Sequence, residues 1–335
     1  MVRPACSHRL TSGVAMITFN GLKYLPEQLD SILAQSRIVD HIVVSDDRST
    51  DGTWEYLQAW ASRSPVSVTL LRNEVQLGLS GNIEQAIRAV DADIIFTADQ
   101  DDIWFADKVA TVCAVFEQDP QVQLVHTDAI LVDGQGRDLG RRLLKELSIT
   151  AAEYAAIRSG TPFQLYCRRN VVTGATAAVR KSLVEQALPL PAGFYHDAWL
   201  AFFSLAIGTV HLIEAPLISY RQHGANLVGV KKLGVVGALR RLWWKLNTAG
   251  ARDKLLAQIS AQQTVLHSRL SAYPGTPSAF RNHAANALRF TQARQALPGS
   301  YLTRATRVLR QAAAGRYQQF SHESRTNILR DLLGR

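Results

Sequence analysis

The chain has 335 residues, of which 47% are hydrophobic and 19% are charged. This composition supplies enough apolar side chain for a full core and excludes a generally disordered chain. The formal net charge of +9 belongs to one end of the chain. Residues 231–335 hold 18 Lys and Arg against 3 Asp and Glu, whereas residues 1–230 hold 19 against 25. The length fits two domains, and we expect them at 1–230 and 231–335.

Cysteine usage and hydropathy point to the cytoplasm. The three cysteines, Cys6, Cys113 and Cys167, show no CxxC spacing, which argues against a disulfide scaffold or a zinc site. The polar start, MVRPACSHRLTSG, lacks the apolar segment of a signal peptide. The longest apolar run, 198–213, is too short and too interrupted to span a bilayer.

The first 130 residues alternate short β-branched runs with helix-like stretches. Strands are predicted at 14–19, 41–45, 66–71 and 94–98, and helices from Pro26 onwards and at 53–61, 81–90 and 107–117. This alternation predicts an α/β fold with a mostly parallel sheet and helices on both of its faces.

The pattern changes after residue 121. Segment 122–132 looks like two short strands, 171–179 like another, and 198–213 like a buried helix that runs into a strand. Beyond residue 231 the pattern is helical almost throughout, with breaks at Pro274, Pro277 and Pro298.

Polar residues follow each of the four early strands. Strand one ends in Phe19 and Asn20, strand two in a run that begins with Asp46 and Asp47, strand three in Arg72 and Asn73, and strand four in Asp99, Gln100, Asp101 and Asp102. In an open parallel sheet the ligand lies beyond the carboxyl ends of the strands. Four such clusters therefore predict one binding site rather than four unrelated turns.

The DQDD segment predicts a metal site. Asp99 and Asp101 are two positions apart and point the same way in an extended chain. Adjacent carboxylates repel unless a cation lies between them, and Mg²⁺ or Mn²⁺ is typically held by one or two carboxylates with substrate phosphate oxygens. The alternative, an acidic turn that caps the next helix, does not explain the other three clusters. The chain has no GxxxxGK[ST] or GxGxxG, which disfavours P-loop NTPases and dinucleotide dehydrogenases.

These residues, with several later motifs, resemble glycosyltransferase family 2, the inverting nucleotide-sugar transferases with the GT-A fold. The matching pieces are MITFNG (16–21), VVSDDRSTDGT (43–53), the glycine segment 73–82, FTADQDDIWFADK (96–108), TGATAAVRKSL (173–183), GFYHDAWLAF (193–202) and ISYRQHGANLVG (218–229). DQDDIW, HDAWL and YRQHGxN, in this order, are most similar to the bacterial branch that includes rhamnosyltransferases and other O-antigen or capsule transferases. The resemblance covers about two-thirds of the chain.

The resemblance implies a role for each candidate residue. Phe19, Asn20, Asp46, Asp47, Asn73 and Asp99 would bind the donor nucleotide; Asp99, Asp101 and His223 would hold the metal; and Asp102, Trp104, His196, Trp199 and Arg221 would contact the diphosphate or the acceptor. Asp197 would be the general base that takes the proton of the acceptor hydroxyl.

Plainer explanations stay open for several of these residues. Asp197 also fits the N-cap of the following apolar helix, and His196 fits a packed histidine. The two tryptophans fit core positions, and Arg221 and His223 fit a solvated loop. Arg48 stands where this family commonly has glycine, so a left-handed backbone there would have to change.

The sequence thus predicts a metal-dependent inverting glycosyltransferase of surface polysaccharide synthesis. It would move a sugar, with rhamnose as one candidate, from a nucleotide-diphosphate donor to a saccharide or lipid-linked saccharide hydroxyl. The alternatives are a nucleotidyltransferase and a non-catalytic GT-A-like binding subunit. The basic stretch LGVVGALRRLWWKL predicts a helix that either lies on the inner face of an anionic membrane or packs on the catalytic domain. Nucleic acid is disfavoured because the arginines are spread without a recognised binding module.

Overall fold

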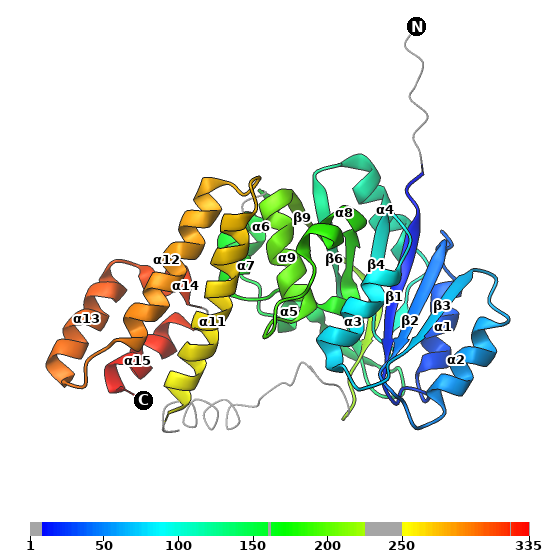
Figure 1. Cartoon of the computed structure of the whole chain (residues 1–335), viewed down its shortest axis with the longest axis horizontal. Helices are drawn as coiled ribbons and strands as arrows, with labels where there is room; N and C mark the ends of the chain where they lie inside the picture. The colour runs from blue at the N-terminus through cyan, green and yellow to red at the C-terminus, as the bar shows by residue number, and fades with distance from the viewer. Residues whose placement is uncertain (1–8, 160–161, 225–249, 322, 335) are drawn as a thin grey trace, which may run out of the picture. The chain divides into compact units, whose positions relative to one another are not determined.

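The computed structural model describes residues 9–159, 162–224, 250–321 and 323–334 (Figure 1). They form two compact units. The sheet unit comprises the described residues up to 159 together with 171–224, and the helical unit comprises 162–170 together with the described residues from 250 onwards. The basic stretch predicted as a helix at 233–246 lies outside the described residues.

The sheet unit contains a single mixed sheet. Its strands are β1 (Ser12–Thr18), β2 (His41–Asp46), β3 (Ser67–Arg72), β4 (Ile94–Ala98), β5 (Ile103–Trp104), β6 (Val122–Val132), β7 (Asp138–Arg142), β8 (Ala177–Arg180) and β9 (Thr209–Arg221). Their order is β3-β2-β1-β4-β8-β6-β9-β5, with β7 paired to β6. The four early strands are parallel, as predicted. Beyond them β8 runs antiparallel to both β4 and β6, and β9 is parallel to β6.

Helices cover both faces of this sheet, as predicted. They are α1 (Leu25–Leu33), α2 (Thr53–Ala61), α3 (Gly78–Ala89), α4 (Lys108–Gln118), α5 (Leu143–Glu146), α6 (Ala151–Arg158), α8 (Lys181–Ala187) and α9 (His196–Ile207). Val14 and Met16 of β1 point to the core shared with α1, α2 and α4. The alternate residue, Ala15, faces the other side, where α3 packs on β1 and β2.

Two local predictions differ from the structure. Segment 122–132 is one strand rather than two, and its pairing with β9 shifts register around the polar pair Thr127 and Asp128. Segment 171–179 forms a strand only from Ala177, because a 3-10 turn at Gly174–Thr176 precedes it. The Thr97 hydroxyl donates to the Gly174 carbonyl and so satisfies a backbone group that the sheet does not pair.

The helical unit has its own core. Its helices are α7 (Phe163–Arg168), α11 (Ala251–Ala272), α12 (Ser278–Gln295), α13 (Tyr301–Ala313), α14 (Arg316–Phe320) and α15 (Ser324–Leu333), and the three prolines lie between helices as predicted. Fully buried Asp331 accepts hydrogen bonds from Arg252, Arg294 and Tyr317.

The short helix α7 comes from the middle of the chain but packs in the helical unit. The Phe163 ring stacks on Phe280 with 3.6 Å between ring centroids. The domain boundary expected at 230/231 leaves α7 in the first domain. A helix of six residues is too short for its sequence to indicate which core it packs into. No helix in the described ranges is long and apolar enough to cross a membrane.

Candidate active site

The loops that follow β1, β2 and β4 are bonded to one another at the carboxyl edge of the sheet. The Gln100 side-chain amide bonds the backbone of Phe19 twice, accepting from its N–H at 2.8 Å and donating to its carbonyl at 3.0 Å. Asn20 Oδ1 accepts from the Thr50 N–H at 2.8 Å. The polar strand ends therefore form one connected surface.

Three carboxylates gather where β4 ends. Asp99, Asp101 and Asp102, here called the acid cluster, each offer an oxygen within 4.8 Å of the others. His223, just after β9, places Nε2 2.7 Å from Asp101 Oδ2. Oxygen-rich sets of this kind suit Mg²⁺ or Mn²⁺.

Asp102 gives an independent reason to expect a cation. Its Oδ1 accepts from the Arg221 N–H at 3.0 Å, whereas its Oδ2 is buried with no hydrogen-bond partner among the described residues. A buried carboxylate oxygen left unpaired is costly, and a bound cation would satisfy it. The residues present thus fit a divalent metal.

The charges of the acid cluster are poorly compensated by protein groups alone. Burial and the neighbouring carboxylates of Asp101 and Asp197 raise the pKa of Asp99 to about 7. Burial and the neighbouring carboxylates of Asp101 and Asp99 raise the pKa of Asp102 well above its usual range. Lys108, fully buried beside them, has its pKa lowered to about 7 by burial. Without metal, protons therefore stabilise the cluster near neutral pH.

Asp197 lies in the first turn of α9. Its Oδ1 accepts from the Ala198 N–H at 2.6 Å and its Oδ2 from the Gly174 N–H at 3.2 Å. The N-cap position belongs to Tyr195, so the N-cap alternative for Asp197 is wrong. The side chain is only partly buried, and its charge acts on Asp99. A partly exposed carboxylate thus lies within electrostatic reach of the acid cluster.

The aromatic residues predicted as acceptor contacts lie in the core. Trp199 is fully buried and donates from Nε1 to the Ala187 carbonyl at 2.9 Å. Trp104 is 3% exposed, with the Lys108 ammonium 3.8 Å from its ring centroid. We therefore correct the expectation that either ring forms an exposed wall. His196 is also buried and packs against Gly174, where a Cβ would approach its Nε2 to 2.4 Å.

Arg221 is a buried residue that bonds the loop carrying the acid cluster. Its side chain is 2% exposed, and Nε donates to the Asp101 carbonyl at 2.7 Å while Nη2 bonds Glu27. This placement corrects both the diphosphate contact and the solvated-loop alternative for Arg221, because its guanidinium is committed to holding the backbone of the loop.

The carboxylates after β2 that the sequence assigns to nucleotide binding are buried and shape the loops. Asp46 is fully buried and accepts from the Thr18 hydroxyl at 2.9 Å. Asp47 accepts from the Asn73 amide at 2.8 Å, with further bonds from the loop that begins α3. Phe19, by contrast, is 46% exposed at the same edge. It therefore offers a free aromatic surface.

Arg48 keeps the left-handed backbone that glycine would adopt, with φ of 66°. The expectation that the turn must change is therefore wrong. The exposed arginine accepts this conformation at a cost of about 1 kcal/mol.

Three residues of this region were not among the predicted site residues: Tyr24, Gln100 and Lys108. The glycine at position 21 is explained by Gln100, because a Cβ there would lie 2.0 Å from Gln100 Oε1. This requirement for glycine arises from a contact between two distant loops, so a single sequence does not indicate it.

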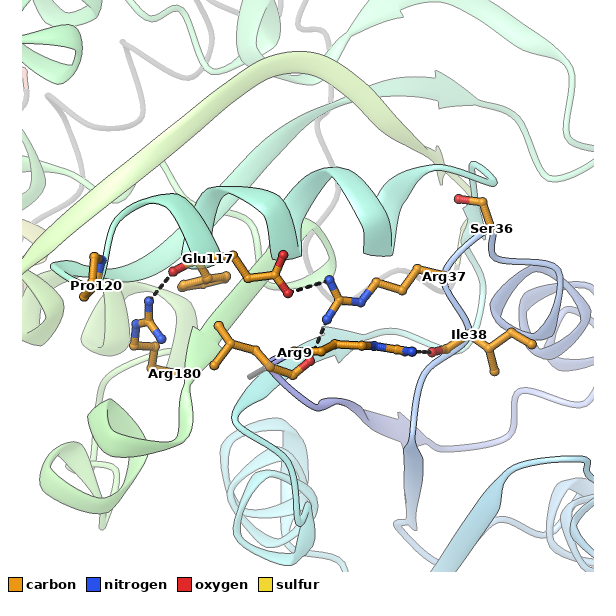
Figure 2. Close-up of a pocket in the computed structure, with 9 residues that line it drawn as sticks. Arg9, Ser36, Arg37, Ile38, Glu117, Pro120 and Arg180 are labelled. Atoms are coloured by element: carbon orange, nitrogen blue, oxygen red, sulfur yellow. Dashed lines mark hydrogen bonds and ion pairs between the residues drawn. The ribbon is translucent and has the colours of Figure 1, made fainter. Parts of the chain in front are cut away.

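A separate cavity lies at the opposite edge of the sheet, near the strands' amino ends (Figure 2). Its volume is about 920 Å³, and Arg9, Arg37 and Arg180 line it. Arg37 pairs with Glu117 at 2.8 Å, and Arg180 donates to backbone carbonyls around the end of α4. The carboxylates of the acid cluster do not line it, so we place the candidate site at the carboxyl edge.

Comparison with known families identifies the family of the chain. The sequence model of glycosyl transferase family 2 matches residues 13–188, more than half of the chain. The chain belongs to glycosyl transferase family 2. It is therefore a glycosyltransferase, and the matched range includes the acid cluster and Phe19.

Individual relatives and solved structures agree with the family. The chain is 28% identical over 243 residues to the dTDP-rhamnosyl transferase RfbG of Shigella flexneri, covering 69% of this chain and 81% of the relative. A mannosyltransferase from Pyrobaculum calidifontis, solved with GDP-Man and Mn²⁺, superposes with a TM-score of 0.53 at 19% identity, over 99% of this chain and 87% of that one. The structure of S. aureus TarS 1-349 with UDP-GlcNAc superposes with a TM-score of 0.56 at 13% sequence identity, and the match covers 97% of this chain and 90% of that one. The GT-A fold is thereby confirmed.

Proposed function

We propose that this glycosyltransferase is metal-dependent and inverting. It would move a sugar from a nucleotide-diphosphate donor to a saccharide or lipid-linked saccharide hydroxyl during surface polysaccharide synthesis. The observation that carries the proposal is the acid cluster with its unpaired Asp102 oxygen, lying within electrostatic reach of Asp197.

The donor nucleotide would lie across the carboxyl ends of β1 and β2. The exposed Phe19 ring supplies an apolar face against a base, and the Gln100 clamp holds its backbone in place. Asn20, Asp46, Asp47 and Asn73 would act by holding the loops around the base. dTDP-rhamnose is the first donor to test, because the relative matched over most of its length is a dTDP-rhamnosyl transferase.

Asp99, Asp101 and His223 would hold Mg²⁺ or Mn²⁺, and the same ion would satisfy the unpaired Oδ2 of Asp102. Such a metal offsets the charge that develops on the leaving diphosphate. The protein holds the metal-binding loop in a fixed conformation. Arg221 fixes the Asp101 carbonyl and the Asp102 carboxylate, so the carboxylates are in place before the donor binds.

Asp197 would take the proton of the acceptor hydroxyl. The Gly174 and Ala198 N–H groups donate to its carboxylate and hold it in place at the start of α9. An acceptor hydroxyl activated by this base would displace the nucleotide diphosphate in a single step at the anomeric carbon, which inverts its configuration. Family membership leaves the nucleotidyltransferase alternative without support, and a binding subunit would have no use for this base.

The acceptor and the location of the enzyme are linked. A position at the inner face of the cytoplasmic membrane would suit a lipid-linked acceptor. In the helical unit, α13 exposes Leu302 and Leu309 beside Arg307 and Arg310, a combination that suits an anionic lipid surface.

The decisive test of function is donor screening. Nucleotide release would be measured with Mn²⁺ from dTDP-rhamnose and from common UDP- and GDP-sugars, with saccharide acceptors. We expect release from one nucleotide class that stops with EDTA. Release that is equally fast in EDTA would contradict metal dependence.

A further inference from the structure

The ring of Tyr24 lies against two groups of the proposed metal site. It stacks on the His223 imidazole with 4.7 Å between ring centroids and 26° between the planes. The guanidinium carbon of Arg221 lies 4.9 Å from the centroid of the same ring. Tyr24 is the N-cap residue of α1, and its N–H donates to Gly21 at 3.0 Å. The ring is therefore anchored to a helix start.

Both groups that contact Tyr24 also contact the acid cluster. His223 Nε2 is 2.7 Å from Asp101 Oδ2, and Arg221 Nε donates to the Asp101 carbonyl at 2.7 Å. Arg221 in turn bonds Glu27 in the first turn of α1. The start of α1 is thus joined to the metal site through an aromatic stack and an ion pair.

The space around the Tyr24 ring is also restricted. A Cβ at Gly134 would lie 3.3 Å from the Tyr24 hydroxyl and 3.8 Å from the Cβ of His223. Glycine at this position leaves room for the phenol and the imidazole together. The phenol is therefore enclosed on this side as well.

The orientation that results suits a metal ligand. His223 Nε2 and Asp101 Oδ2 lie 2.7 Å apart as a hydrogen-bonded pair. Both atoms are candidate ligands, and a bound cation would replace the proton that they share. An imidazole already held at this spacing loses less rotamer freedom when it binds the ion.

We propose that Tyr24 is a positioning residue of the metal site: its ring fixes the His223 imidazole with Nε2 facing Asp101 and so increases the affinity for Mn²⁺. The role rests on the proposed metal dependence. It belongs to the aromatic ring and not to the hydroxyl, because the stack and the guanidinium contact both involve the ring face.

The test is a double-mutant cycle on Mn²⁺ affinity. Binding of Mn²⁺ would be measured by calorimetry or by EPR of free Mn²⁺, in the presence of the nucleoside diphosphate that binds the wild-type protein. The variants are Tyr24→Phe, Tyr24→Ala, His223→Ala and the double variant Tyr24→Ala/His223→Ala. Tyr154→Ala is the matched control, since Tyr154 also lies beside an arginine, Arg158, but on α6.

We expect Tyr24→Phe and Tyr154→Ala to bind Mn²⁺ like the wild type. Tyr24→Ala should weaken binding about tenfold, as loss of a residue that orients a ligand does. In the His223→Ala background the same substitution should add nothing, because Tyr24 acts through that imidazole. Unfolding temperatures without metal check the fold, and Tyr24→Leu replaces the alanine variant if that variant is unfolded.

Two results would overturn the role of Tyr24. One is unchanged Mn²⁺ affinity in Tyr24→Ala; the other is an equal loss with and without His223, which indicates a general structural effect. If the wild type binds no Mn²⁺ with any nucleoside diphosphate, the metal dependence itself is wrong, and that outcome is distinct because it appears before any variant is made.

Discussion

His223 Nε2 lies 2.7 Å from Asp101 Oδ2, although 122 positions separate the two residues in the sequence. Strand β5 explains the approach. It follows the acid cluster directly and pairs antiparallel with β9, with Ile103 opposite Ser219 and Trp104 opposite Ile218. This register places the end of β9, and the histidine after it, beside the loop that carries the carboxylates.

Metal binding should strengthen as the pH rises towards neutrality. In the metal-free protein Asp99 holds a proton below its pKa of about 7, and the cation must displace that proton. Apparent Mn²⁺ affinity should therefore rise up to about tenfold per pH unit between pH 5.5 and 7. Calorimetry in two buffers of different ionisation enthalpy measures the released proton. Affinity that does not change over this range would contradict the proton's role, and Asp99→Asn should flatten the profile.

Replacing Asp197 should separate catalysis from binding. Asp197→Asn keeps the size and one of the two acceptor oxygens that the Ala198 and Gly174 N–H groups use, but removes the base. We expect turnover to fall by about 10²-fold or more, with nucleotide and Mn²⁺ binding retained. Glu185→Gln, at an exposed position of α8, is the matched control and should turn over normally. An Asp197→Asn enzyme of normal rate would exclude the base.

Phe19 should contribute to nucleotide affinity through its exposed ring. Phe19→Ala removes the stacking face but leaves the two backbone bonds to Gln100. We expect the Kd of the nucleoside diphosphate to rise about tenfold, as loss of one aromatic stack does, with no change in unfolding temperature without ligand. Phe19→Tyr should bind normally. Equal affinity in all three proteins would place the base elsewhere.

The exposed leucines of α13 should contribute to vesicle binding. Leu302 and Leu309 are 78% and 58% exposed, so the double change to glutamine should not disturb the fold. We expect flotation with vesicles rich in anionic lipid to decrease for the variant and to weaken with salt for the wild type. Leu77→Gln, on an exposed leucine at the start of α3, is the control. If the double variant floats with vesicles as well as the wild type does, α13 does not bind the lipid surface.

The sequence predicts the carboxyl edge of the sheet well because the relevant signals are local. Four β-branched runs that each end in polar residues suffice to place Phe19 and the acid cluster on the same side of a parallel sheet. The GT-A fold follows from the same alternation together with the motif order, and family membership confirms it.

Long-range contacts set the limit of that prediction. Trp199 is adjacent in sequence to a helix start, but only the packed helix shows that its ring faces the core. The bond between Arg221 and Glu27 spans 194 positions, and no local pattern indicates it. The roles proposed for Tyr24 and Arg221 therefore depend on the contact between the start of α1 and the end of β9, which only the structure shows.

The most direct measurement of the central claim is a thermal shift of the wild-type protein with nucleoside diphosphates, with Mn²⁺ or with EDTA. Because a ligand that binds only the folded state stabilises it, dTDP, UDP or GDP should raise the unfolding temperature when Mn²⁺ is present. The shift should disappear with EDTA and in Asp101→Asn. A nucleotide shift of the same size in EDTA, or no shift with any of the three nucleotides, would contradict a metal-dependent nucleotide-sugar site.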